Sequence, residues 1–431
     1  MKLNYKRTTL VGLAFLSICA FWQVYDNLIP LILKETFAVD DTLIGVVMAL
    51  DNVLALFMLP LFGKLSDKTR TRVGRRMPYI VGGTVAAVVC LAILPLAERQ
   101  NNLVLFFAGL GCVLIAMATY RSPAVALMPD VTPKPLRSQG NAVINLMGAL
   151  GGMLMLGTMQ VLLPKQVTGE VFRPNYLPIF AVLGILMAVC IALLFWKINE
   201  PACVHAMEEE SRAAGLSPDE EETAPDGTGK KMPPAQARSF AFILASVFLW
   251  FMGYNAVTSG FSRYATQELK GSFSLILMVC TAAAIVAYLP VGAIAARIGR
   301  KKTILVGVLF LGVAFAAGSF FHQVSALLYI FFIFAGFGWA FINVNSYPMV
   351  VEMADGADVG KYTGYYYTVS MTAQIVTPIF SGFLMGHVGY RTLFPYAAFF
   401  VFASFVTMLM VRHGDSKPQP KKGLEALDVD D

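Results

Sequence analysis

Long apolar runs recur along the whole chain at nearly regular intervals. Each run reaches the length of about 20 residues that a helix needs to cross the hydrocarbon core of a bilayer, and short polar segments separate most of them. The pattern predicts twelve membrane-spanning helices, at residues 9–33, 42–62, 79–97, 103–128, 139–163, 176–196, 239–262, 271–296, 302–321, 325–350, 362–386 and 390–411. The predicted fold class is therefore an all-α polytopic membrane protein.

The composition supports this prediction, because 57% of the 431 residues are hydrophobic and only 14% are charged. Soluble domains carry roughly a quarter of charged residues, and the mean hydropathy of +0.65 leaves too little polar surface to cover a globule. The composition excludes an ordinary soluble protein. We expect a multi-pass protein of the plasma or inner membrane, with the lipid bilayer as its surroundings.

The positive charges predict the orientation of the chain. Lys and Arg concentrate in the N-terminus, the even-numbered loops and the C-terminal tail, which hold 25 of the 33. Because cytoplasmic loops are enriched in these residues, both termini are predicted to be cytoplasmic. The chain carries a net charge of +6, but its basic residues lie in short loops and form no basic stripe. We therefore expect no nucleic-acid partner.

A polar stretch at 197–238 interrupts the series after the sixth run. It is rich in Glu, Pro and small residues and nearly lacks large apolar side chains, a composition that favours disorder. We predict a disordered cytoplasmic linker between an N-terminal six-helix bundle at 1–196 and a C-terminal six-helix bundle at 239–412. A cytoplasmic tail is expected at 413–431.

The two halves resemble each other. Residues 74–76 (GRR) recur at 299–301 (GRK), and SPAVALMPD at 122–130 recurs as YPMVVEMAD at 347–355, each with an offset of 225. The shared offset at two distant places indicates a duplication. Repeated halves around a central site are the architecture of secondary transporters, so we expect inverted three-helix repeats within each bundle.

The loop after the second run combines glycines, an aspartate and several bases in the sequence GKLSDKTRTRVGRRMP, at 63–78. Opening and closing a cytoplasmic gate requires charge contacts that can break, and this loop together with the end of the fourth run supplies them. The simpler alternative is positive-inside charge alone. The gate residues that we predict are Gly63, Asp67, Arg72, Gly74, Arg75, Arg76, Asp130, Arg137 and Arg300.

This loop resembles the signature between helices 2 and 3 of the major facilitator superfamily, in the longer form of the glycoside-pentoside-hexuronide symporters and the plant-type sucrose symporters. The segment PAVALMPDVT at 123–132 is similar to the segment after helix 4 of the sucrose transporters. The resemblance covers essentially all twelve spans. It implies uptake of a sugar coupled to a cation.

The chain departs from these relatives at their cation sites. Sodium-using relatives carry two aspartates on helix 2, and the matching positions here are Ala55 and Leu59. The aspartate on helix 4 of the plant sucrose symporters falls on Leu114. A proton is therefore a better candidate than sodium for the coupling ion.

Only three charged residues lie deep inside the predicted spans: Asp26, Asp51 and Arg121. At 1.5 Å per residue both aspartates lie roughly 10 to 14 Å below the outer boundary, and Arg121 lies deeper. A charged side chain near the middle of the bilayer costs at least about 2.5 to 3.5 kcal/mol and usually serves a function. We predict that these residues couple transport to the ion, although a contact that merely locks helices together is the alternative.

Neutral polar and aromatic residues crowd the spans of the second half, and a smaller set accompanies the charges of the first. A sugar needs a ring for its apolar face and amides for its hydroxyls, although helix packing and interhelical hydrogen bonds need the same residues. The predicted substrate-binding residues are Trp22, Gln23, Asn27, Asn52, Tyr120, Asn145, Trp250, Tyr254, Asn255, Trp339, Asn343, Asn345 and Gln374.

The sequence offers no enzyme site: it has no metal-ligand spacing, no nucleophile motif and no phosphate loop for ATP. We expect no cofactor and no metal, a monomer, and transport driven by an ion gradient. The predicted function is import of a glycoside, a disaccharide such as maltose or sucrose, by proton symport with alternating access. The alternatives are an uncoupled sugar facilitator or exporter, and a sugar sensor that keeps the fold but does not transport.

Overall fold

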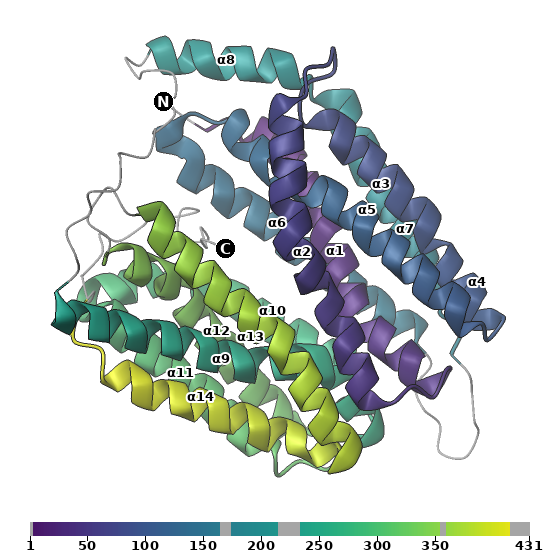
Figure 1. Cartoon of the computed structure of the whole chain (residues 1–431), viewed down its shortest axis with the longest axis vertical. Helices are drawn as coiled ribbons and strands as arrows, with labels where there is room; N and C mark the ends of the chain where they lie inside the picture. The colour runs from purple at the N-terminus through teal and green to yellow at the C-terminus, as the bar shows by residue number, and fades with distance from the viewer. Residues whose placement is uncertain (1–2, 164–173, 214–232, 354–358, 414–431) are drawn as a thin grey trace. The chain divides into compact units, whose positions relative to one another are not determined.

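The computed structural model describes residues 3–163, 174–213, 233–353 and 359–413, and in these ranges the chain is helical and has no strand. Twelve helical stretches are long and apolar enough to cross a membrane, which confirms the predicted number of spans (Figure 1). Most helices begin and end within a few residues of the predicted positions. The last residues, 414–431, which include nearly all of the predicted tail, lie outside the described ranges.

Contacts between helices divide the chain into two units. Unit 1 comprises Met1–Ala38 and Leu50–Asp219, and unit 2 comprises Val39–Ala49 and Glu220–Asp431. The first turns of one helix, α2, thus belong to unit 2 and its remainder to unit 1. The helices of the first half are α1 (Tyr5–Glu35), α2 (Asp41–Lys68), α3 (Met77–Leu91), α4 (Ile93–Arg99), α5 (Leu103–Asp130), η1 (Lys134–Leu136), α6 (Arg137–Leu162), α7 (Leu177–Lys197) and α8 (Glu200–Ala213).

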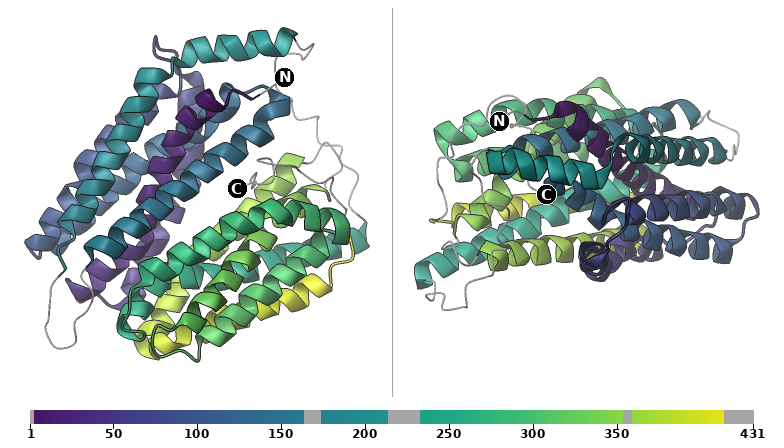
Figure 2. Two further views of the ribbon diagram at one scale, coloured as in Figure 1. Left: turned by 180° about the vertical axis from the view of Figure 1, so that it is seen from behind. Right: turned by 90° about the horizontal axis from the view of Figure 1, so that it is seen from above.

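In unit 1, α1 packs along α6 and α5 packs along α3, while α7 contacts both α1 and α3 (Figures 1 and 2). Glycine permits the close approach of α1 and α6, since a Cβ on Gly151 would lie 2.1 Å from the carbonyl oxygen of Leu16. Small residues serve this purpose in membrane bundles, where lipid tails are as apolar as leucine and tight packing drives helix association.

Unit 2 contains α9 (Pro234–Gln267), α10 (Phe273–Ile298), α11 (Arg300–Gly318), α12 (Ala326–Val351), α13 (Val359–His387), η2 (Tyr390–Thr392) and α14 (Leu393–Leu409). Its α9 packs on α13 and α14, and its α12 packs on α10 and α11. Gly307 and Gly338 bring α11 and α12 together, since a Cβ on either residue would lie within 2.7 Å of the carbonyl oxygen of the other.

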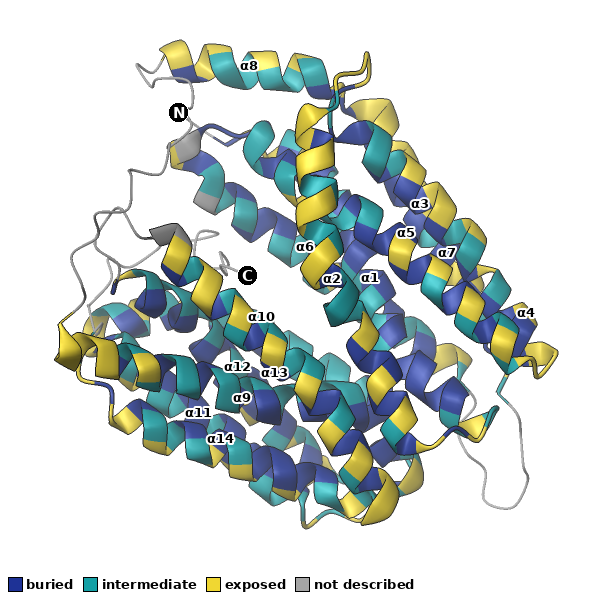
Figure 3. Cartoon of the chain, viewed as in Figure 1, coloured by how far each residue is buried: buried dark blue, intermediate teal, exposed yellow. Residues whose placement is uncertain are grey.

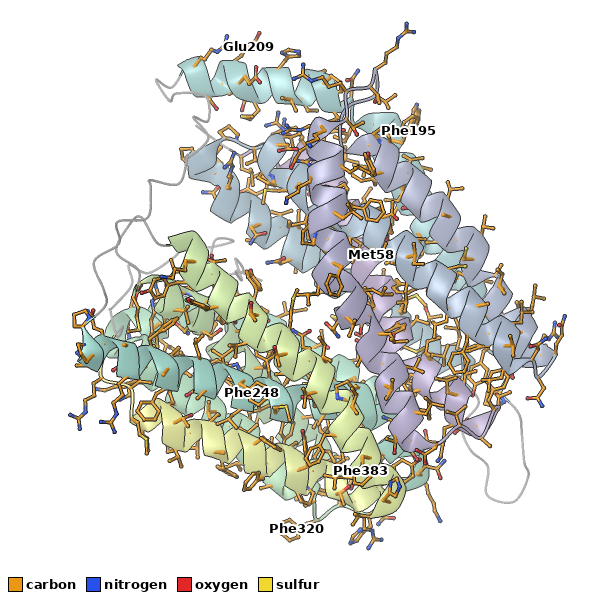
Figure 4. All side chains as sticks on the ribbon, viewed as in Figure 1. Met58, Phe195, Glu209, Phe248, Phe320 and Phe383 are labelled. Carbon is orange, nitrogen blue, oxygen red and sulfur yellow. The ribbon has the colours of Figure 1, made fainter. Side chains whose placement is uncertain are left out.

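Many large apolar side chains point outward in both units, along the helices coloured as exposed in Figure 3. Val104, Val161 and Phe320 are about four-fifths exposed, and Figure 4 shows Phe320 at the edge of unit 2. Surfaces of this kind would cause a water-soluble protein to aggregate. They suit a protein that is surrounded by lipid.

Two local predictions require correction. The segment 197–238 was predicted to be disordered, but residues Glu200–Ala213 form the helix α8, and α9 already begins at Pro234; residues 214–232 lie outside the described ranges. The predicted single helix at 79–97 is divided into α3 and α4 at Ala92. Pro95 accounts for this break, because it has no N–H to donate to the carbonyl of Leu91.

Candidate substrate and coupling site

A small cavity in unit 1 brings together two of the three predicted coupling residues. Asp51 comes to this cavity from α2 and Arg121 from α5, and the ring of Trp22 comes from α1. The rest of the lining is apolar: Leu54, Ala55, Leu59, Leu114 and Ala118. The three positions at which the related symporters carry acids, Ala55, Leu59 and Leu114, thus surround the same cavity, and Asp51 lies one helical turn before Ala55.

The charged groups at this cavity interact with aromatic and amide neighbours. The guanidinium carbon of Arg121 lies 5.4 Å from the centroid of the Trp22 ring, within the range of a cation–π contact. The side-chain amide of Asn52 donates to Asp51 Oδ1 at 2.9 Å. Asp26 lies on α1, in the same unit as Asp51 and Arg121. The structure therefore groups all three predicted coupling residues in unit 1.

The other predicted binding residues of unit 1 lie on α1, α5 and α6. Asn27 is buried and donates to the Gln23 carbonyl at 3.0 Å, while its own side-chain oxygen has no hydrogen-bond partner in the described part of the chain. Gln23 extends towards α6, where its Oε1 would lie 3.3 Å from a Cβ on Gly152. Tyr120 is fully buried, and Asn145 is partly buried on α6.

In unit 2 three aromatic residues of α9 and α12 form a compact set of ring contacts. The rings of Tyr254 and Trp339 lie parallel, with centroids 3.5 Å apart and an interplanar angle of 4°. Phe251 meets Trp339 edge-on at 5.5 Å. These contacts join α9 to α12, and we name the three residues the aromatic platform (Phe251, Tyr254 and Trp339).

Trp250 was predicted to offer its ring to a sugar, but it is fully buried among the helices, so its ring faces no open space. The reason is its place on α9, since it follows the buried residue Val247 on one face of that helix. Asn345 is also fully buried and donates to the backbone carbonyl of Phe341 at 2.9 Å. Asn255, Asn343 and Gln374 remain partly exposed, and the buried Nδ2 of Asn255 has no partner in the described ranges.

Four residues of the predicted gate form a cluster of ion pairs at one end of unit 1, which we name the charge cluster: Asp67, Arg75, Arg76 and Asp130. The carboxylate of Asp130 pairs with both arginines. Arg75 Nη2 lies 2.7 Å from Oδ1, and Arg76 Nε lies 2.8 Å from Oδ2. Arg76 also contacts Asp67 at 2.5 Å. Burial acts to lower the pKa of Arg76, but the hydrogen bond and charge of Asp130, together with Asp67, hold this pKa above its ordinary value.

The remaining gate residues shape and extend the cluster. Arg137 donates to the backbone carbonyls of Pro129 and Thr132 and so caps the end of α5. Gly63 allows α2 to pass Ser122, whose oxygen would lie 3.0 Å from a Cβ there. Arg72 is exposed.

Unit 2 contains the counterpart of this cluster at the repeated sequence. Arg300 pairs with Glu352 at the end of α12, with Nη2 at 2.7 Å from Oε1. Gly299 precedes Arg300 with a φ of +92°, just as Gly74 precedes Arg75 with a φ of +116°. The repeat predicted Asp355 as the counterpart of Asp130, but this residue lies outside the described ranges.

The family model of the Major Facilitator Superfamily matches residues 11–282 and 243–428. The chain belongs to the major facilitator superfamily. Curated relatives include the lactose permease of Lactobacillus helveticus, 25% identical over 179 residues, which cover 38% of this chain and 28% of that protein. Another is Solute carrier family 45 member 3 of Mus musculus, 29% identical over 137 residues, which cover 29% of this chain and 25% of that protein. The chain matches only about a quarter of the length of these relatives.

Solved structures share the fold of this superfamily member. The nucleoside transporter NupG has a TM-score of 0.64 and 16% identity, with coverage of 95% of this chain and 100% of that one. The POT family transporter PepTSo has a TM-score of 0.63 and 12% identity, with coverage of 95% and 98%. At these identities the likeness shows the fold alone. Membership of this superfamily and the twelve long apolar helices of the described ranges indicate a multi-pass membrane protein, consistent with the plasma or inner membrane.

The sequence did not reveal a buried ion pair in unit 2. Arg263 Nη1 lies 2.9 Å from Asp41 Oδ1, and the two side chains are 0% and 2% exposed. The Tyr390 hydroxyl donates to the same carboxylate. Arg263 was predicted to lie in a loop after residue 262, but α9 continues to Gln267 and carries it inside the packing. An acid at the first position of an apolar helix, as Asp41 is in α2, was the available signal.

Proposed function

We propose that this transporter imports a glycoside, a disaccharide such as maltose or sucrose, by proton symport with alternating access. The observation that carries the proposal is the cavity of unit 1, which Asp51 and Arg121 both line within a bundle of apolar helices. Because charge inside a bilayer is costly, a carboxylate at such a cavity indicates a role in an ion pathway.

The lining of the cavity favours a proton over sodium. Asp51 is the one residue of this lining that has a side-chain oxygen. A hard cation is held by several oxygen ligands, and the related sodium symporters have acids where this chain has Ala55 and Leu59. A proton needs only one carboxylate, and Arg121 can hold that carboxylate in its charged form until the proton arrives.

Sugar recognition is the proposed role of the neutral groups. The aromatic platform offers an apolar ring face, and the partly exposed amides of Asn255, Asn343 and Gln374 offer donors and acceptors for hydroxyls. The likeness to a lactose permease supports a glycoside as the substrate.

The charge cluster is the proposed cytoplasmic gate. Its bonds join the loop after α2 to the end of α5, through contacts of 2.5 to 2.8 Å that are partly accessible to water. Ion pairs of this kind are strong enough to hold one state of a two-state equilibrium and weak enough to break in each cycle.

Counterflow of labelled disaccharides into proteoliposomes tests the substrate, with maltose, sucrose, lactose and a labelled nucleoside as the negative probe. We expect counterflow of at least one disaccharide and none of the nucleoside. Absence of counterflow with every sugar contradicts the proposal and leaves the sensor alternative. Uptake that does not alkalinise a weakly buffered medium favours the uncoupled facilitator or exporter.

A further inference from the structure

Glu200, the first residue of α8, is buried against the loop that carries the charge cluster. Its carboxylate accepts hydrogen bonds from the backbone N–H groups of Arg75, Arg76 and Met77, at 2.8 to 3.1 Å. These N–H groups open α3, whose N-cap residue provides no side-chain hydrogen bond of its own. An anion at a helix N-terminus satisfies donors that have no partner within the helix and interacts favourably with the helix dipole. Glu200 thus caps α3 from a distant part of the chain.

Gly74 shows that the loop is shaped around this carboxylate. Its φ of +116° is a conformation that residues with a side chain rarely adopt. In addition, a Cβ at this position would lie 2.2 Å from Glu200 Oε2. A larger residue at position 74 would therefore strain the loop and displace Glu200 at the same time.

The helix α8 is itself held in place. Asn199 accepts a hydrogen bond from the backbone N–H of Ala202 and caps α8. Further along, Glu210 lies 3.7 Å from Arg7 of α1. Both views show α8 lying across the end of unit 1 (Figures 1 and 2).

We propose that Glu200 is a positioning residue of the transport cycle, through which α8 holds the loop after α2 in the conformation that closes the charge cluster. The backbone N–H groups that Glu200 binds belong to Arg75 and Arg76, and the side chains of these same residues pair with Asp130. By fixing the backbone of Arg75 and Arg76, Glu200 orients both guanidinium groups towards Asp130. This inference rests on the proposed function, because it gives α8 a part in transport.

The first test measures how firmly Glu200 holds the loop after α2, and it needs no sugar. Hydrogen exchange of the amides of residues 75–77 is compared in the full-length wild type, Glu200→Ala and Glu200→Gln, in detergent. We expect exchange to be faster by about tenfold or more in Glu200→Ala, because three amides lose their acceptor. Glu200→Gln keeps one acceptor oxygen and the side-chain volume, so its exchange should be intermediate. The matched control is Glu209→Ala, because Glu209 is exposed on the same helix (Figure 4) and should leave exchange unchanged.

The second test measures transport by the same variants in proteoliposomes. We expect turnover to fall about tenfold in Glu200→Ala and less in Glu200→Gln, with the sugar KM within about twofold of wild type, because the population of the closed gate changes and the binding residues do not. Unchanged exchange at 75–77 in Glu200→Ala overturns the inference. Faster exchange with wild-type turnover, or a change in KM alone, overturns it as well. If the wild type transports no glycoside, the proposed function fails, and the exchange measurement still decides whether α8 holds the loop.

Discussion

The two units each enclose an acidic and a basic residue, but in different surroundings. In unit 2 the side chains of Asp41 and Arg263 are 2% and 0% exposed and lie in direct contact, and the Tyr390 hydroxyl satisfies the carboxylate further. In unit 1, Asp51 and Arg121 are only partly buried and line a cavity. We call Asp41 and Arg263 the sealed pair, because both side chains are shielded from solvent, whereas Asp51 and Arg121 border a cavity.

This difference distinguishes charged residues that stabilise the fold from charged residues that take part in transport. Because the side chains of Asp41 and Arg263 are buried and in direct contact, we interpret this pair as one that stabilises the packing of α2 against α9. A pair at a cavity can change its protonation and its partners during a cycle. The burial of the side chains and their access to a cavity therefore distinguish two sites that each contain an aspartate and an arginine.

The largest expected effect is loss of coupling in Asp51→Asn. The amide preserves the shape of the side chain but can neither hold a negative charge nor accept the coupled proton. We expect no accumulation of sugar against a gradient, while exchange of sugar across the membrane continues. The measurement is uptake of labelled sugar with and without an imposed pH gradient, and accumulation at the wild-type level would refute the role of Asp51.

Breaking the sealed pair should affect stability rather than coupling. Arg263→Met leaves Asp41 buried without its partner, which costs about 3 to 5 kcal/mol for a buried pair. The double variant Asp41→Leu with Arg263→Met should recover most of this loss, because it removes both charges. Thermal unfolding in detergent measures the effect. Equal destabilisation of the single and double variants would contradict the sealed-pair interpretation.

Removing a ring of the aromatic platform should weaken sugar binding and nothing else. Trp339→Ala removes the ring that stacks on Tyr254 and should raise the half-saturation for sugar by about five- to a hundredfold, equivalent to about 1 to 3 kcal/mol of lost apolar contact. The pH optimum should not move, because the ionisable groups of the coupling site are in unit 1. A shifted pH profile with unchanged affinity would reverse the proposed roles of the two units.

The smallest effects are expected in the charge cluster. Asp67 is 56% exposed and contacts only Arg76 of the two arginines, so Asp67→Asn should lower turnover less than about fivefold, as for an exposed ion pair of up to about 1 kcal/mol. Asp130 is 13% exposed and binds both arginines, so Asp130→Asn should have the larger effect. Turnover and sugar affinity measured for each variant decide the order, and a larger effect of Asp67→Asn would show that Asp130 does not organise the cluster.

The twelve spans could be predicted because burial in lipid requires long apolar runs, and such runs are visible in one sequence. The helix α8 could not be predicted in this way, because it is polar and depends on its contacts with the loop at Arg75 and Arg76. Arg263 was misplaced because apolar length marks the bilayer rather than the end of a helix, and α9 continues beyond it. The burial of Trp250 depends on which face of α9 meets its neighbours, which the apolar pattern of a membrane helix does not define.

A coupling role for Asp26, Asp51 and Arg121 was predicted from their rarity in the spans, and the structure places Asp51 and Arg121 at one cavity of unit 1. Charged side chains are costly in lipid and therefore rare in the spans, which is why these three residues could be identified from the sequence. By contrast, the partner of each asparagine could not be predicted, because an amide can bond to its own helix, as Asn27 and Asn345 do.

Proton movement driven by sugar decides whether Asp51 carries the coupling charge. A transported disaccharide is added to weakly buffered proteoliposomes that contain the wild type, Asp51→Asn or the Asp41→Leu and Arg263→Met double variant, and the external pH is recorded. We expect alkalinisation with the wild type and with the double variant, and none with Asp51→Asn. Alkalinisation by Asp51→Asn at the wild-type rate, or its loss in a correctly folded double variant, would contradict the assignment of the coupling charge to the cavity of unit 1.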